Sequence, residues 1–62
     1  MIQVLIVDDE APARGELAYL LGRLMPDAAL HQAATGQAAL DLAAATAFAV
    51  AFLDITMPGL NG

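Results

Sequence analysis

The 62-residue sequence contains no cysteine and no lysine, and its two bases, Arg14 and Arg23, stand against seven acids. Without cysteine, no disulfide can staple the fold. The net charge of −5 argues against a nucleic-acid surface, because phosphate contacts need clustered lysine and arginine. We therefore expect no direct contact between this chain and nucleic acid.

Long apolar runs are also missing. No stretch approaches the roughly 20 residues that a helix needs to cross a bilayer. A secretory signal would begin with a base, but residues 1–7 carry none and lead directly into Asp8, Asp9 and Glu10. The sequence predicts a cytoplasmic chain without a membrane segment.

Large apolar side chains are scarcer than the composition suggests. Hydrophobic residues form 60% of the sequence, but 15 of them are alanines, which add little buried area each. A chain of about 60 residues buries only about 60% of the surface that its unfolded form exposes. We expect one small domain with a thin core.

Three apolar segments predict β-strands. Residues 3–7 form a short run without polar alternation that is apolar after Gln3, as expected for a strand covered on both faces. Residues 49–53 are an unbroken apolar run, which also predicts a strand. Residues 28–33 are less apolar and include His31 and Gln32, which predicts a partly exposed edge strand.

Two helices are predicted between these strands. Within residues 12–24 one helix face is marked by four leucines, Leu17, Leu20, Leu21 and Leu24. Pro12 suits the first turn of this helix, and Pro26 enforces its end. Thr35 suits the N-cap of a second helix over residues 36–45.

The order strand, helix, strand, helix, strand with short links predicts two right-handed crossovers and a parallel sheet. With one helix on each face, the strand order is 2-1-3, the first half of a flavodoxin-like α/β sheet. Residues 55–62 are rich in turn formers and include a Pro-Gly step, which predicts a loop after the third strand.

Three acids stand at the carboxyl ends of two neighbouring strands. Asp8 and Asp9 follow the first strand, and Asp54 follows the third. Where the strand order reverses, these carboxylates would meet and repel one another unless a proton is taken up or a cation binds. An oxygen-only ligand set with open water positions favours Mg²⁺.

Taken one at a time, these acids have simpler interpretations. The Asp8-Asp9 pair could cap the following helix or stabilise its positive end, and Asp54 could be the polar end of a strand. Only their joint position at one sheet edge favours a site.

Both strand ends lie in recognisable motifs, LIVDDE at residues 5–10 and FLDITMPGLNG at residues 52–62. Together they resemble the receiver domain of two-component response regulators. The likeness covers the whole sequence, and we interpret residues 1–62 as the N-terminal half of a receiver, truncated after the loop that follows strand 3. The second motif and the EAP of residues 10–12 look similar to regulators that carry a LytTR-type DNA-binding output domain.

The resemblance implies roles for four residues. Asp54 matches the acid that accepts a phosphoryl group from a sensor histidine kinase. Asp9 matches a direct Mg²⁺ ligand, Asp8 a ligand that acts largely through water, and Thr56 the residue whose backbone carbonyl completes the protein ligands. The implied protein is a phosphoacceptor in a signalling phosphorelay rather than an enzyme, and it controls an output, such as transcription, outside this chain.

The family pattern continues beyond this likeness with a hydroxyl residue after a fourth strand and a lysine after a fifth. Neither feature is present in these 62 residues. We therefore expect weak metal binding and impaired phosphorylation of the isolated chain. An apolar edge at the third strand, together with the sheet faces, predicts self-association into a homo-oligomer.

Two other functions fit parts of the pattern. Enzymes of the haloacid-dehalogenase type also use an aspartate nucleophile with Mg²⁺, but their motif needs a second acid where this chain has Thr56. A structural or protein-interaction fragment of a receiver, which never accepts phosphate, is the second alternative, and the missing half of the pattern favours it.

The remaining polar residues have structural interpretations. His31, the single histidine, is expected to be a solvated or hydrogen-bonded strand residue. Arg14 and Arg23 are expected on the solvated face of the first helix, which in the receiver family commonly helps to dock the kinase.

Overall fold

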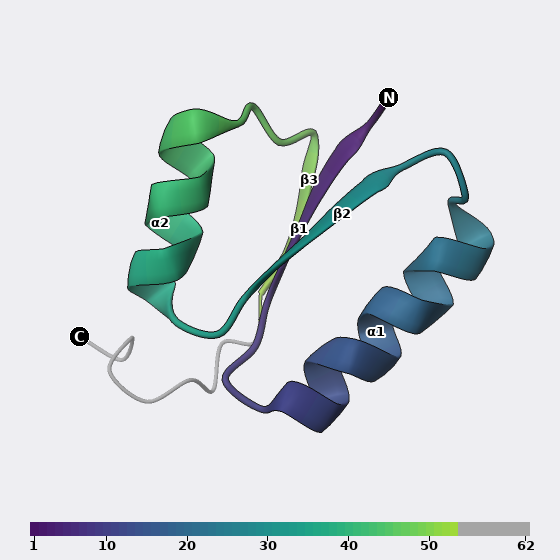
Figure 1. Ribbon diagram of the computed structural model, residues 1–62, viewed down its shortest axis with the longest axis horizontal. Helices are drawn as coiled ribbons and strands as arrows, with labels where there is room; N and C mark the ends of the chain where they lie inside the picture. Colours follow the sequence, from purple (N-terminus) through teal and green to yellow (C-terminus); the bar gives the residue numbers. More distant parts are fainter. Residues whose placement is uncertain (54–62) are drawn as a thin grey trace.

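The computed structural model describes residues 1–53, which form a three-stranded parallel sheet with one helix against each face (Figure 1). The elements follow one another in the order β1 (Gln3–Val7), α1 (Ala11–Leu24), β2 (Ala29–Ala33), α2 (Gly36–Ala45) and β3 (Val50–Leu53). The sheet order is β2-β1-β3, and both pairings are parallel. The predicted half of a flavodoxin-like α/β fold is confirmed.

Strand β1 is the centre of the fold. Four of its five residues are buried, and alternate side chains of this strand point to opposite faces of the sheet. Val4 and Ile6 pack with Leu21 on the α1 side, whereas Leu5 and Val7 pack with the α2 side. This two-sided burial explains why the strand shows no polar alternation in the sequence.

The core is thin, as predicted. Within residues 1–53 six hydrophobic residues are buried, and four of them belong to β1. The largest fully buried side chains are Ile6, Val4 and Val7. Alanines of α2 supply partly buried contacts to one side of this core without adding much apolar volume.

Helix α1 begins one residue before Pro12 and ends before Pro26, close to the predicted limits. Its predicted leucine face is partly wrong. Leu21 is buried and Leu17 packs beside it, but Leu20 is 47% exposed and Leu24 is 78% exposed. The helix instead turns Ala18 and the following Met25 toward the sheet.

Helix α2 and strand β2 agree with the expectations. Thr35 is the N-cap of α2, and its hydroxyl oxygen accepts a hydrogen bond of 3.0 Å from the Ala38 amide. Strand β2 lies at one edge of the sheet, and among its residues only Ala33 is buried.

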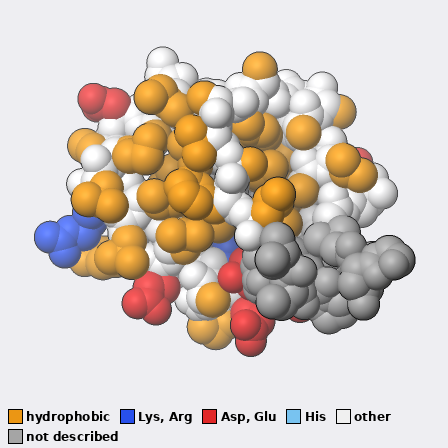
Figure 2. All heavy atoms as spheres, turned by 180° about the vertical axis from the view of Figure 1, so that it is seen from behind, with side chains coloured by type: hydrophobic (Ala, Val, Ile, Leu, Met, Phe, Trp, Pro, Cys, Tyr) orange, Lys and Arg blue, Asp and Glu red, His pale blue; other side chains and the backbone are white. Residues whose placement is uncertain are grey.

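Strand β3 forms the other edge of the described sheet. Val50, Ala51 and Leu53 are exposed, and Phe52 is half-buried against the α1 side of the core. Seen from behind, the surface carries a broad hydrophobic area (Figure 2). None of the helices within residues 1–53 has the length and apolarity that a membrane crossing requires.

Candidate metal centre at the carboxyl ends of the strands

The carboxyl ends of the three strands are level at one edge of the sheet. Val7, the last residue of β1, is the Cα partner of Ala33 on β2 and of Leu53 on β3. Asp8 follows Val7 directly and therefore lies at the middle of this edge, at the end of the central strand. In open parallel sheets, sites form at this position, where the strand order reverses.

Three consecutive acids gather at the end of β1. Asp8, Asp9 and Glu10 each offer a carboxylate oxygen, and these oxygens lie within 4.8 Å of one another. Asp8 is half-buried, whereas Asp9 and Glu10 are exposed. Glu10 is not among the ligands predicted from the sequence. Its position directly after the aspartate pair is the sequence feature that could have indicated it.

Asp8 is the most constrained of the three acids. Its backbone amide donates a hydrogen bond of 3.1 Å to the carbonyl of Ala33, which extends the β1–β2 pairing by one residue. One of its carboxylate oxygens, Oδ1, accepts a hydrogen bond of 2.9 Å from the Glu10 amide. The loop between β1 and α1 is thus folded back on the Asp8 side chain, and Oδ2 is not used by that bond.

The helix-cap interpretation of these acids is only partly met. The N-cap of α1 is Glu10, and its side chain makes no capping hydrogen bond. Asp8 bonds to the amide of that N-cap residue rather than to an amide inside the helix. The first turn of α1 contains no acid.

Arg14 does not lie on a purely solvated face, so that expectation is wrong. Arg14 is half-buried, and its Nη1 donates a hydrogen bond of 2.7 Å to the backbone carbonyl of Asp8. Its Nε donates a second bond of 3.2 Å to Oε1 of Gln32 on β2. Arg23 does lie on an exposed face, where its guanidinium carbon is 5.9 Å from the centre of the Tyr19 ring.

The donor set at this edge fits Mg²⁺. Hard carboxylate oxygens are the ligands that Mg²⁺ prefers, and oxygens on opposite sides of an octahedral ion lie about 4 Å apart, twice the metal–oxygen distance. The oxygens of Asp8, Asp9 and Glu10 lie within 4.8 Å of one another, a wider spacing than one ion allows, so the side chains would have to draw together to share it. Two of the three residues are exposed, so water can supply the remaining positions.

Asp54 and Thr56, the other two predicted site residues, lie outside the described residues, as does the predicted loop over residues 55–62. The described structure therefore brings together Asp8 and Asp9 and adds Glu10 to them. Leu53, the residue bonded to Asp54, is the last residue of β3 and the partner of Val7.

His31 takes part in a separate contact away from the acids. Its Nε2 lies 2.7 Å from Oε1 of Gln3, the first residue of β1, and its ring meets the Phe48 ring edge-on at 5.1 Å. This contact joins β1, β2 and the segment before β3 near the amino end of the sheet. The structural interpretation of His31 agrees with it.

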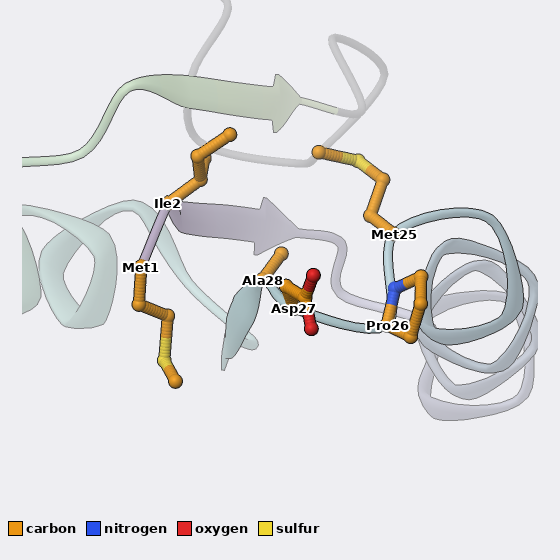
Figure 3. Close-up of a pocket in the computed structure, with 6 residues that line it drawn as sticks. All are labelled: Met1, Ile2, Met25, Pro26, Asp27 and Ala28. Carbon is orange, nitrogen blue, oxygen red and sulfur yellow. The ribbon is translucent and has the colours of Figure 1, made fainter.

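A pocket of about 360 Å³ lies at the opposite end of the sheet from the acids (Figure 3). Its lining comes from the residues before β1 and from the turn between α1 and β2, namely Met1, Ile2, Met25, Pro26, Asp27 and Ala28. Asp27 is the single ionisable side chain in this lining. The pocket offers no set of polar groups that converge on a ligand, and the acid cluster remains the candidate site.

Comparison with known proteins supports the resemblance that the two sequence motifs indicate. The family model of the response regulator receiver domain matches residues 4–62. The sensory transduction protein LytT of Bacillus subtilis is 42% identical over 62 residues, which is 100% of this chain and 26% of that protein. The positive alginate biosynthesis regulatory protein of Pseudomonas aeruginosa is 45% identical over 62 residues, covering 98% of this chain and 25% of that protein.

No solved structure matches the chain. The chain spans about a quarter of the length of the two curated relatives. The family match covers nearly all of the sequence, including the acids after β1 and the segment that contains Asp54. The chain therefore belongs to the response regulator receiver domain family, whose members are signalling domains of two-component systems.

Proposed function

We propose that this chain supplies the phosphoryl-accepting half of a receiver domain, in which Asp54 receives the phosphoryl group and Mg²⁺ is held beside it. Asp8 and Asp9, Asp54 itself and the backbone carbonyl of Thr56 are the proposed metal ligands. The donor of the phosphoryl group is a sensor histidine kinase. On this proposal, residues 1–62 form the N-terminal half of the receiver.

One observation carries the proposal, the register between β1 and β3. Val7 and Leu53 are Cα partners, and each is followed by an aspartate, Asp8 in one strand and Asp54 in the other. Neighbouring strands lie about 4.8 Å apart, and consecutive Cα atoms about 3.8 Å. Asp8 and Asp54 therefore follow residues at the same level of neighbouring strands, which is what two carboxylates that share one ion would need.

The chemistry follows from these residue types. An oxygen of the Asp54 carboxylate attacks the phosphorus of the donor phosphohistidine, so a phosphorus–oxygen bond forms while the phosphorus–nitrogen bond breaks, and the imidazole nitrogen leaves with its electron pair. When bound, Mg²⁺ neutralises the charge that builds up on the phosphoryl oxygens. The contribution of Asp8 and Asp9 is to fix negative oxygens at the sheet edge before any ion arrives.

The output of this receiver is proposed to be transcription. One relative is named a regulatory protein of alginate biosynthesis and the other a sensory transduction protein. The resemblance to LytTR-type regulators supports a DNA-binding output outside this chain. The seven acids and two bases of these residues agree with an output that contacts DNA elsewhere.

Self-association of the isolated chain is proposed to occur through strand β3 or the sheet faces. Strand β3 is an edge of the described sheet, and Val50, Ala51 and Leu53 are exposed on it. An exposed apolar edge offers unpaired backbone groups to a second chain. The hydrophobic area seen in Figure 2 offers additional contact surface.

The alternative function is a structural or protein-interaction fragment that never accepts phosphate. One observation favours it: Asp9 and Glu10 are exposed, and exposed acids are common without a bound ion. On this alternative the acids at the sheet edge remain an exposed, hydrated cluster.

Phosphorylation with a small donor separates the two functions. The 62-residue chain is incubated with acetyl phosphate, with and without Mg²⁺, and its mass is followed together with that of Asp54→Asn and Asp27→Asn. The proposal expects a slow, Mg²⁺-dependent adduct of one phosphoryl group that Asp54→Asn abolishes and Asp27→Asn retains. Asp27 is an exposed acid in the turn between α1 and β2, so its variant controls for the lost charge. No adduct, or one that survives Asp54→Asn, contradicts the proposal.

A further inference from the structure

Arg14 connects three elements beside the acid cluster. From the first half of α1 its guanidinium donates to the carbonyl of Asp8 in the loop after β1, at 2.7 Å, and to the side-chain amide oxygen of Gln32 on β2, at 3.2 Å. Arg14 is half-buried. Arg23, the other base on the same helix, donates to the Tyr19 hydroxyl at 3.5 Å on an exposed face.

The two acceptors of Arg14 show what the side chain does. Both are neutral oxygens, a peptide carbonyl and an amide oxygen, although three carboxylates lie in the adjoining loop. A guanidinium presents its donors in a rigid planar fork, so two bonds to separate elements fix the distance between them. The Asp8 backbone is thereby tied to the edge strand β2 by two bonds that do not use the carboxylate oxygens of the cluster.

The backbone of Asp8 is hydrogen-bonded at both its amide and its carbonyl. Its amide donates to the Ala33 carbonyl at 3.1 Å, and its carbonyl accepts from Arg14 at 2.7 Å. With this backbone fixed, Asp8 Oδ1 accepts from the Glu10 amide at 2.9 Å, which closes the loop that carries Asp9. The position of the whole cluster therefore depends on the Asp8 backbone.

We propose that Arg14 is a positioning residue for the acid cluster, which, anchored on Gln32, fixes the Asp8 peptide so that the carboxylates of Asp8 and Asp9 are ready for a divalent cation. The metal part of this inference rests on the proposed function. Groups that hold a metal ligand in place from behind typically change metal affinity by about 10–100-fold when they are removed.

Electrostatic repulsion alone predicts the opposite change in Mg²⁺ affinity when Arg14 is removed. Arg14 is a cation next to a site for a cation, so removing its charge lowers the repulsion and would tighten Mg²⁺ binding. Salt and water screen this repulsion at an exposed loop, which limits its size. Positioning and charge effects are thus separated by the direction in which the affinity moves.

The test measures Mg²⁺ affinity of the 62-residue chain by NMR for the wild type and for Arg14→Ala, Arg14→Lys, Gln32→Ala and Arg23→Ala. Positioning predicts binding about tenfold weaker for Arg14→Ala. Arg14→Lys keeps the charge but loses the fork, so it should resemble Arg14→Ala, and Gln32→Ala should weaken binding in the same direction. Arg23→Ala removes the same charge from the same helix and should leave the affinity within about twofold of the wild type.

A metal-free readout keeps the inference separate from the proposed function. In the absence of Mg²⁺, Arg14→Ala should raise the water-exchange rates of the Asp8 and Glu10 amides several-fold, while far-UV circular dichroism remains that of the folded chain and Arg23→Ala leaves these rates unchanged. Unchanged exchange rates in Arg14→Ala, tighter Mg²⁺ binding, or full recovery by Arg14→Lys would overturn the positioning role. A wild type that shows no Mg²⁺ response while the exchange rates do rise would contradict the proposed metal site and leave the positioning of Asp8 by Arg14 supported.

Discussion

Val7 and Leu53 are Cα partners in the parallel pairing of β1 with β3, so both strands reach the same edge of the sheet at the same level. Val7 is 2% exposed and belongs to the core, whereas Leu53 is 61% exposed at the sheet edge. The central strand is therefore fixed by packing on two faces, and β3 is aligned to it by the backbone ladder. This alignment links the acids at residues 8–10 to the phosphoacceptor proposed at residue 54.

Leu21→Ala is expected to destabilise the fold more than any other leucine substitution on α1. Leu21 is 7% exposed and packs with Val4 and Ile6, so its loss removes apolar burial and leaves a cavity, at a cost of about 2–5 kcal/mol. Leu20→Ala, at 47% exposure on the same helix, is the matched control and should cost roughly 0.5 kcal/mol or less. Urea unfolding followed by circular dichroism compares the two, and equal losses would contradict the packing described for α1.

Thr35→Ala is expected to weaken α2 by removing its N-cap. The Thr35 hydroxyl accepts the hydrogen bond of the Ala38 amide at 3.0 Å, and losing such a cap costs about 1 kcal/mol. Thr35→Ser retains the hydroxyl and should remain within roughly 0.5 kcal/mol of the wild type. The free energy of unfolding is the measurement, and a Ser variant as unstable as the Ala variant would show that the cap is not the cause.

Val50→Lys is expected to reduce self-association of the chain. Val50 is the first residue of the edge strand β3 and is 39% exposed. A lysine on a sheet edge opposes pairing with a second chain. Leu40→Lys places the same charge on α2, where Leu40 is 65% exposed, and should change association less. Sedimentation at micromolar concentration distinguishes the variants; a wild type that is monomeric at that concentration would rule out the proposed homo-oligomer.

The strands and their order could be predicted because their signals are local. The run over residues 3–7 is apolar at every position after Gln3, as burial of both faces of β1 requires. Thr35, a typical N-cap residue, marks the start of α2. Short links between alternating strands and helices then leave few arrangements of the sheet. The acids at the end of β1 followed from the same reasoning, since a site forms where the strand order reverses.

The face of α1 could not be chosen from the sequence. Leu17 and Leu21 belong both to the predicted stripe with Leu20 and Leu24 and to the observed stripe with Ala18 and Met25. The predicted stripe contains the exposed Leu20 and Leu24, whereas the observed stripe contains the smaller Ala18. The predicted stripe therefore looked more apolar in the sequence. Which stripe is buried depends on where the small sheet lies against the helix, and this is decided by tertiary packing.

The role of Arg14 could not be predicted either. A lone arginine on a helix is typical of a solvated face, and its two acceptors lie far apart in the sequence, at Asp8 and Gln32. Only the crossing of α1 over the sheet brings these groups within reach of one guanidinium. The same holds for the contact of His31 with Gln3, which spans two strands.

The most direct test of the central claim is a Mg²⁺ titration of the chain that follows the amides of Asp9 and Asp54 by NMR. If residues 8, 9 and 54 hold one ion, both amides shift and saturate with a single weak dissociation constant, and either Asp9→Asn or Asp54→Asn abolishes the response of both. Asp27→Asn, which removes an exposed acid from the turn after α1, should leave that constant unchanged. Amides that do not respond, or that respond with independent constants, would contradict a shared site.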